Sequence, residues 1–289
     1  GFVALSLTAI ASPFVEGAAL RATANGEMPY GFLRGLGSVA FIIANVAGGL
    51  LVSQFGVWAM PAWTLASLTL FALTNWFLLV PDPALHATHK EGGAQKAAVR
   101  SLVKNRRFII LVIACGFIQS AHAFYYSFST LVWRGQGIDA GSIGVLWSIG
   151  VGTEVAFLWT LPFFERRLAP ETLIFAGACG AVVRWMLLGF APTGFILWPL
   201  QTLHALSFAA AHVGAMRLIY REAPEAAAGM AQTLYSVLSS GVFMGLATLG
   251  SGMLYDSVGA HGYWAMSAMA AAGAGFALLL QPRRSAVKT

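Results

Sequence analysis

The chain has 289 residues, of which 58% are hydrophobic and only 10% charged, and its mean hydropathy is +0.73. Soluble domains carry about a quarter charged residues, so this composition excludes a soluble globular protein and indicates an integral membrane protein. The net charge of +6 does not indicate nucleic-acid binding, because the basic residues lie between apolar runs. Cys115 and Cys179 each lie singly inside apolar runs, so no disulfide framework or cysteine metal site is predicted.

The predicted elements are membrane-spanning helices, each of which needs about 20 mostly apolar residues. In chain order, nine such runs cover residues 2–20, 31–53, 58–80, 107–131, 140–163, 172–190, 194–216, 229–254 and 260–281. The predicted fold class is therefore an all-α membrane protein. One long break, residues 81–106, is rich in Lys and Arg and has the composition of a linker between two domains.

The distribution of cations predicts the orientation. If the 81–106 loop is cytoplasmic and the loops alternate sides, fourteen of the seventeen Lys and Arg residues fall on the cytoplasmic side. Of the others, Arg134 lies in an outside loop, and Arg34 and Arg184 lie within spans. This pattern satisfies the positive-inside rule. It predicts a multi-pass protein of the inner (plasma) membrane with a cytoplasmic C-terminus.

An internal repeat predicts the domain organisation. "GGLLVSQFG" at 48–56 resembles "SGMLYDSVG" at 251–259, and equivalent positions in two six-span halves would explain the similarity. Residues 1–80 would then hold the last three spans of an N-terminal half, and residues 107–289 a complete C-terminal half. The chain also starts with Gly1 directly in an apolar run. We therefore expect an incomplete chain with nine transmembrane helices of an expected twelve.

Formally charged side chains deep in the spans are candidate functional groups, since each costs about 2.5–3.5 kcal/mol at a helix centre. They are Glu16, Arg34, Glu154 and Arg184. Two static ion pairs, Glu16 with Arg34 and Glu154 with Arg184, are the structural alternative. An arginine keeps its charge and its planar fork suits a carboxylate, whereas a buried carboxyl can exchange a proton. This chemistry predicts anion binding by the arginines and proton transfer by Glu154.

Coupling would follow if Glu154 and Arg184 were neighbours. A substrate carboxylate that competes for Arg184 removes the counter-charge of Glu154, so Glu154 becomes easier to protonate. His204, one turn from Gln201, is a candidate for substrate binding or proton relay, with a structural role as the alternative. His212 lies about 80° further around the helix, which favours a structural hydrogen bond. No further ligand accompanies either histidine at i+4, so no metal is expected.

Polar residues recur at helical spacing, and converging polar faces predict a hydrated cavity, with interhelical hydrogen bonding as the alternative. The faces are Gln119, His122 and Tyr126; Arg34, Ser38, Phe41 and Asn45; and Gln232, Tyr235, Ser236 and Ser239. Trp147 lies seven residues before Glu154 on the same face. An aromatic ring beside a proton-carrying carboxyl suits an aromatic acid.

Five segments carry a resemblance to a known family: "YGFLRGLGSVAFIIANVAGG", "QSAHAFYYSFSTLVW", "GVLWSIGVGTEVAF", "VVRWML" and "QTLHALSFAAAHVGAMRLI". They resemble the corresponding segments of the phenylpropionate permease family of the major facilitator superfamily, whose members are proton-linked importers of aromatic carboxylic acids. A more distant similarity to the lactose permease group implies that Glu16 and Arg34 bind substrate and that Arg184 and His204 couple protons. The sequence departs from that group at Ser207, where the group carries a carboxylate. This departure weakens a sugar-transport interpretation.

The resemblance implies a major facilitator superfamily helical bundle, with helices 4–6 in residues 1–80. We expect a secondary active transporter that imports an aromatic monocarboxylate similar to 3-phenylpropionate, together with protons, by alternating access. The expected proton-coupling residues are Glu154, His204 and Arg184. The expected substrate-binding residues are Arg184, Arg34, Glu16, His122, Tyr126, Trp147, Gln119, Gln201 and Tyr235.

Other functions stay open at this point: an oligosaccharide or nucleoside proton symporter, a drug exporter, or a truncated, non-transporting membrane scaffold. An enzyme is not expected, because no nucleophile–base pair, HExxH-type motif or phosphate-cradling motif occurs in the sequence. The expected partners are a small aromatic carboxylate, protons and the lipid bilayer, without nucleic acid, metal or cofactor. We expect a monomer.

Overall fold

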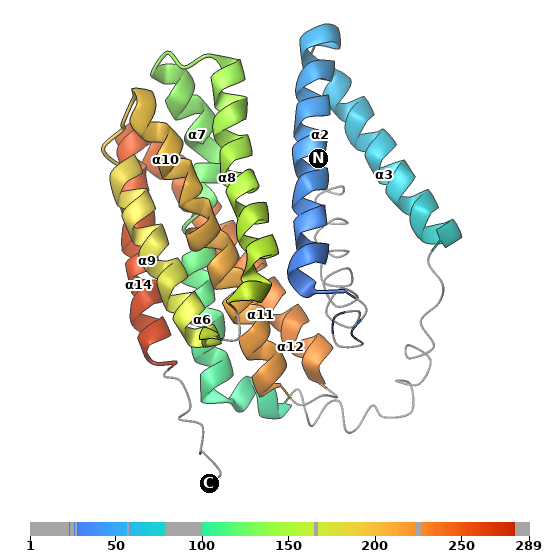
Figure 1. The fold of residues 1–289 in the computed structure, drawn as a ribbon. Helices are drawn as coiled ribbons and strands as arrows, with labels where there is room; N and C mark the ends of the chain where they lie inside the picture. The colour runs from blue at the N-terminus through green and yellow to red at the C-terminus, as the bar shows by residue number, and fades with distance from the viewer. Residues whose placement is uncertain are drawn as a thin grey trace.

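The computed structural model describes residues 23, 26, 28–56, 58–78, 100–164, 167–223 and 227–280. Within these ranges the chain forms helices joined by turns and contains no strand, which confirms the all-α class for this part of the chain (Figure 1). Four stretches there are long and apolar enough to cross a membrane: Arg106–Gly135, Gly141–Phe163, Pro170–Leu188 and Ala228–Leu278. The count of nine spans stays a prediction, and the span at 2–20 lies outside the described residues.

The helices follow the predicted spans closely. The first described helices are α2 (Tyr30–Phe55) and α3 (Ala59–Leu78). Beyond residue 99 come α6 (Arg106–Ser120), α7 (Ala123–Gly135), α8 (Ala140–Thr160) with the 3-10 turn η2 (Leu161–Phe163), and α9 (Pro170–Leu188). The next group comprises η4 (Gly194–Ile196), α10 (Leu197–Thr202), the π-helical η5 (Ala205–Ala210) and α11 (Ala211–Glu222). The last comprises α12 (Ala228–Tyr235), the π-helical η7 (Ser236–Phe243), α13 (Met244–Val258), η8 (Gly259–Gly262) and α14 (Tyr263–Leu278).

Local sequence signals set several helix starts. The Asn105 side chain accepts a hydrogen bond from the Arg107 backbone N at 2.9 Å and caps α6. The Asp139 side chain caps α8 by accepting from the Ser142 backbone N at 3.0 Å. Pro170 opens α9, where its missing N–H costs no hydrogen bond. These residues explain why the helices begin within a few positions of the hydropathy boundaries.

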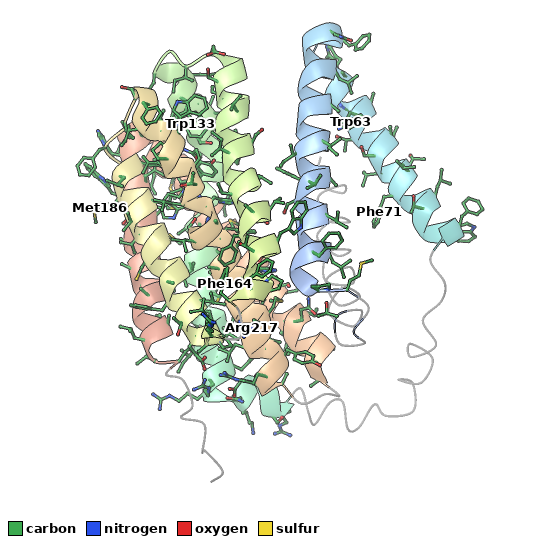
Figure 2. The ribbon with its side chains drawn as sticks, viewed as in Figure 1. Trp63, Phe71, Trp133, Phe164, Met186 and Arg217 are labelled. Atoms are coloured by element: carbon green, nitrogen blue, oxygen red, sulfur yellow. The ribbon has the colours of Figure 1, made fainter. Side chains whose placement is uncertain are left out.

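Helices α6 to α14 pack into one bundle, and α2 and α3 stand beside it, with α2 packed against α8 (Figure 1). Within the bundle α9 packs against α14, α11 and η5, and α14 also packs against α6. Figure 2 shows Trp133 inside the bundle and Trp63 and Phe71 on the separate helix α3. Large apolar side chains of α3 face outward; Trp76, for example, is 83% exposed. An apolar exterior is what a helix surrounded by lipid requires.

Small residues bring α9 and the 205–211 segment into close contact. A Cβ placed on Gly177 would lie 2.9 Å from the Ala211 backbone N and 3.0 Å from the Leu206 carbonyl oxygen. A Cβ on Gly180 would lie 2.8 Å from the Leu206 Cβ. Gly177, Gly180 and Arg184 follow one another at helical spacing on one face. The glycines therefore let α9 approach closely enough for Arg184 to reach the neighbouring segment.

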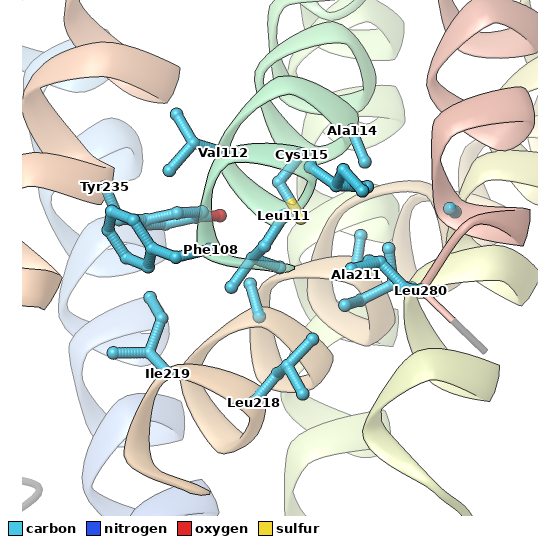
Figure 3. Packing of buried hydrophobic residues seen from close by; sticks show 14 of the residues in the cluster. Phe108, Leu111, Val112, Ala114, Cys115, Ala211, Leu218, Ile219, Tyr235 and Leu280 are labelled. Atoms are coloured by element: carbon cyan, nitrogen blue, oxygen red, sulfur yellow. The ribbon is translucent and has the colours of Figure 1, made fainter. Parts of the chain in front are cut away.

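A separate core lies between α6, α11 and α12. Phe108, Leu111, Cys115, Ile219 and Tyr235 are all buried in it (Figure 3). At the same end of these helices, Arg107 Nη2 lies 2.8 Å from Glu171 Oε1 and Arg107 Nε lies 3.4 Å from Glu222 Oε1, while Arg221 pairs with both carboxylates. This network joins α6, α9 and α11.

The backbone is irregular where the sequence predicts uninterrupted spans. The span predicted at 107–131 is two consecutive helices, because a turn at Ala121 and His122 separates α6 from α7. The π-helical segments η5 and η7 begin directly after His204 and Tyr235, respectively. Such π segments occur frequently at functional sites, and irregular backbone at membrane depth is tolerated only where protein or a cavity surrounds it.

Candidate substrate and proton site

Arg184 is the centre of a buried polar cluster. The side chain projects from α9, has no exposed surface, and meets three residues spaced one turn apart on the facing segment. Its Nη1 lies 2.9 Å from His204 Nδ1 and donates to Ser207 Oγ at 3.3 Å, and its Nη2 donates to Gln201 Oε1 at 3.1 Å. The structure therefore brings the predicted residues Gln201 and His204 together on Arg184.

Two aromatic rings flank the guanidinium. The Cζ atom of Arg184 lies 4.5 Å from the centroid of the Tyr125 ring and 4.6 Å from that of Trp185. The Tyr125 hydroxyl donates to Gln201 Oε1 at 3.0 Å, so Gln201 accepts from both the arginine and the tyrosine. A desolvated cation over a ring gains about 2 kcal/mol. These contacts help to hold the charge in an apolar setting.

His204 lies between Arg184 and Glu154. Its Nε2 is 3.5 Å from Glu154 Oε2, and Glu154 Oε1 accepts a hydrogen bond from Ser38 at 2.9 Å. Glu154 belongs to α8 and Ser38 to α2, and both side chains are buried. The Glu154 carboxylate thus connects α2 to the bundle formed by helices α6 to α14. The direct Glu154–Arg184 contact considered from the sequence is not formed among the described residues.

The contact with Arg184 determines which nitrogen of His204 accepts. A guanidinium can only donate hydrogen bonds, so Nδ1 is the acceptor in this geometry. In the neutral ring the proton then resides on Nε2, which faces Glu154. A second proton on Nδ1 would point at a cationic donor.

The charge of Arg184 is held by neutral groups in the described part of the chain. Its hydrogen-bond partners there are an imidazole, a hydroxyl and an amide, and its Nε has no hydrogen-bond partner. A buried charge without a counter-ion is costly. The arrangement is therefore suited to receiving an anion.

His122 joins the same cluster through Ser207. It lies at the break between α6 and α7, where its Nδ1 is 3.1 Å from the Gln119 carbonyl oxygen and its Nε2 is 3.3 Å from Ser207 Oγ. Its ring is 5.7 Å from the His204 ring. Ser207 thus contacts both Arg184 and His122 at the position where the sequence lacks a carboxylate.

Tyr126 and Trp147 form an aromatic wall next to the cluster. Their ring centroids are 6.1 Å apart at 19°, and Trp147 also lies 4.5 Å from the Tyr125 ring. The Tyr126 ring is 5.7 Å from His122 and 43% exposed, so one side of this wall is accessible. Ring contacts therefore run from the exposed Tyr126 through Trp147 to Tyr125, whose ring lies against Arg184.

Other predicted site residues lie elsewhere. Tyr235 is buried with Cys115 in the core between α6, α11 and α12, and the Gln119 side-chain oxygen has no hydrogen-bond partner in the described residues (Figure 3). Glu16 and the side chain of Arg34 lie outside the described residues. The His212 ring stacks on Phe208 with centroids 6.1 Å apart, and Phe208 in turn stacks on His204 at 5.1 Å.

Sequence reasoning missed Tyr125, Trp185 and Ser38 as contacts of the charged residues. Ser38 was visible in a polar stripe, but nothing in that stripe indicated a contact with Glu154. Tyr125 and Trp185 were two among many aromatic residues, and only the tertiary packing distinguishes them. Among the described residues, no group of three or more His, Cys, Asp or Glu side chains could hold a metal ion.

The sequence is similar to three curated proteins and matches one family profile. The sequence is 33% identical over 247 residues to a probable 3-phenylpropionic acid transporter of Escherichia coli (strain K12), which covers 84% of this chain and 63% of that protein. It is 24% identical over 281 residues to the uncharacterized transporter YwbF of Bacillus subtilis (strain 168), covering 96% and 68%. It is 26% identical over 245 residues to a maltose permease of Geobacillus stearothermophilus, covering 84% and 61%.

The chain thus spans less than two thirds of the length of two of these three relatives. The profile of the MFS_1 like family matches residues 2–266. The chain belongs to this family of the major facilitator superfamily, and the three relatives above are named as two transporters and a permease.

Proposed function

We propose that the protein is a secondary active transporter that imports an aromatic monocarboxylate, similar to 3-phenylpropionate, together with protons by alternating access. One observation carries this proposal: Arg184 is a fully buried cation whose described hydrogen-bond partners are all neutral. A carboxylate would supply the missing counter-charge. The guanidinium fork favours a carboxylate over a neutral group.

Proton coupling would run through His204. When a substrate carboxylate draws Arg184 away, Nδ1 of His204 loses the cationic donor that now lies 2.9 Å away. The ring can then take up a proton, and the imidazolium pairs with Glu154 at Nε2. Anion binding and proton uptake thereby favour each other. Release of the anion returns Arg184 to Nδ1 and expels the proton.

The ring of the substrate would lie along Tyr126 and Trp147. The exposed face of Tyr126 gives access, and the continuous contact from Tyr126 through Trp147 to Tyr125 leads to Arg184. Aromatic pairs favour offset or edge contacts with centroids about 4.5–7 Å apart. An aromatic acid would thus place its ring against Tyr126 and Trp147 and its carboxylate against Arg184 at the same time.

The connection from α2 to α8 would serve alternating access. Ser38 and Glu154 join the two parts of the chain, so the charge state of Glu154 acts at the contact that has to rearrange. The proposal includes two domains, residues 1–80 and 107–289, joined by a cytoplasmic loop at 81–106. It also includes a monomer in the inner membrane with its C-terminus in the cytoplasm.

A proton-linked oligosaccharide symporter is the second candidate, favoured by the similarity to the maltose permease. The test uses the full-length protein in proteoliposomes with labelled 3-phenylpropionate, with and without an inward proton gradient. Uptake that rises with the gradient and is competed by aromatic acids supports the proposal. Competition by maltose instead of acids would favour the sugar symporter, and no uptake of either ligand would favour a non-transporting scaffold.

A further inference from the structure

We propose that Tyr125 is a positioning residue that holds Arg184 for carboxylate recognition by acting through Gln201. The proposal rests on the proposed function, because it concerns the same anion site. Tyr125 would not itself bind the carboxylate. It would fix the plane and direction of the guanidinium that does.

The Gln201 amide has a defined orientation. Its Nε2 donates to the Leu197 carbonyl oxygen at 3.1 Å, so its Oε1 must point the other way, toward Tyr125 and Arg184. The side chain is fully buried. Both lone pairs of Oε1 are then used, one by the tyrosine hydroxyl at 3.0 Å and one by Arg184 Nη2 at 3.1 Å. The tyrosine therefore fixes the acceptor that orients one edge of the guanidinium.

The Tyr125 ring is itself held in place. Its centroid lies 4.5 Å from Trp147, 5.6 Å from Trp185 and 5.9 Å from Trp133, and its side chain is 2% exposed. A ring packed against three tryptophans changes its rotamer only with difficulty. Removing the hydroxyl should thus leave the ring and its contact with Arg184 in place. The variant Tyr125→Phe would remove the hydroxyl that donates to Gln201 and keep the ring.

The structure offers a matched control in Tyr263. Its ring also packs on Trp185, at 5.8 Å and nearly parallel, and its side chain is 1% exposed. Its hydroxyl, however, has no hydrogen-bond partner among the described residues. Tyr263→Phe therefore makes the same chemical change against the same tryptophan without removing a bond to Gln201.

The experiment measures competition of labelled 3-phenylpropionate uptake by 3-phenylpropionate and by its amide, with the full-length protein in proteoliposomes. Tyr125→Phe should weaken binding of the acid about 3- to 10-fold, the effect of one hydrogen bond, and leave the amide unchanged. Tyr263→Phe should change neither ligand. Equal losses for acid and amide in Tyr125→Phe, or equal effects of the two variants, would overturn the proposal.

Gln201→Met provides the second measurement, because it removes the acceptor. It should reproduce the selective loss for the acid, and the Tyr125→Phe/Gln201→Met double variant should lose little more than Gln201→Met alone. Additive losses would show that Tyr125 does not act through Gln201. A wild-type protein that binds acid and amide equally would refute the proposed function itself, whereas a selective wild type with an unaffected Tyr125→Phe would refute only this inference.

Discussion

Arg184 and His204 meet through a 2.9 Å contact between Nη1 and Nδ1, although they lie on different helices and 20 residues apart. The contact joins a guanidinium, which can only donate, to an imidazole nitrogen, which accepts in this geometry. The other nitrogen of the same ring faces Glu154 at 3.5 Å. A candidate proton carrier thus lies between a candidate anion site and a carboxylate, and each of these three groups can be tested separately.

Replacement of His204 by Asn tests the role of Nδ1. The Asn side-chain oxygen lies near the position of Nδ1 and can still accept from Arg184, but the amide cannot take up a proton. We expect exchange of substrate across the membrane to persist and accumulation driven by a proton gradient to fall at least about 100-fold, the lower end of what proton transfer by a side chain contributes. Normal accumulation would exclude His204 as the proton carrier.

Replacement of Glu154 by Gln tests the carboxylate. The Gln oxygen can still accept from Ser38, so the contact between α8 and α2 is preserved. We expect proton-driven accumulation to be abolished while exchange stays measurable, because exchange needs no net proton release. Counterflow and gradient-driven uptake, measured side by side, check this. Loss of both activities would indicate a role in folding or binding, and unchanged accumulation would remove Glu154 from the coupling mechanism.

Apolar length and charge were enough to predict the helices but not their irregularities. The run at 140–163 corresponds to α8 and η2, because a hydrophobic stretch of that length has one stable form in lipid. The break at His122 and the π segment after His204 leave hydropathy unchanged, so a hydropathy pattern cannot reveal them. They depend on which neighbouring helix supplies hydrogen bonds.

The types of residue that form the site were predictable from the sequence, but the contacts between them were not. The rarity of charge in the membrane pointed to Arg184 and Glu154, and helical spacing placed His204 with Gln201. The spacing could not show that His204 would separate the two charges, because the distance between them depends on how closely α9 packs against η5. That approach is set by Gly177 and Gly180, whose role appears only in the packed structure.

Gly177 therefore supplies a prediction about stability. An Ala side chain there would lie 2.9 Å from the backbone of Ala211, and backbone cannot move aside as a flexible side chain can. We expect Gly177→Ala to destabilise the protein by about 1–3 kcal/mol, the usual cost of overpacking. Gly250→Ala is the control, because a Cβ at that position meets nothing within 4 Å. Thermal unfolding in detergent should show a lower midpoint for the first variant only; equal midpoints would contradict close packing at Gly177.

Ser207→Asp tests whether a carboxylate placed beside Arg184 prevents the guanidinium from binding the substrate. Ser207 Oγ lies 3.3 Å from Arg184 Nη1, so an introduced carboxylate would pair with the guanidinium and compete with the substrate. We expect acid uptake to fall at least about tenfold, since a hydrogen bond to a charged group contributes about 1.5–3 kcal/mol. Ser207→Asn, of nearly the same shape but neutral, should be affected less. Similar losses in both variants would point to steric disruption of this buried position.

The last prediction concerns the anion itself. Arg184→Lys keeps the positive charge but loses the planar fork, so binding of 3-phenylpropionate should weaken by about 1.5–3 kcal/mol, the value of one charge-assisted hydrogen bond. The amide of the same compound never uses that bond, so its binding should change little. Competition assays on the full-length protein with both ligands therefore separate a substrate contact from a structural one, which predicts equal losses for acid and amide.

Arg34→Lys is the control for this experiment, since the expected partner of Arg34 is Glu16, eighteen residues earlier in the sequence. A structural pair there should weaken acid and amide alike. If the acid-selective loss occurs at Arg34 instead, the roles of the two arginines are reversed. If it occurs at neither, a buried guanidinium held by His204, Gln201 and Ser207 is a packing element, and the carboxylate is bound by another part of the protein.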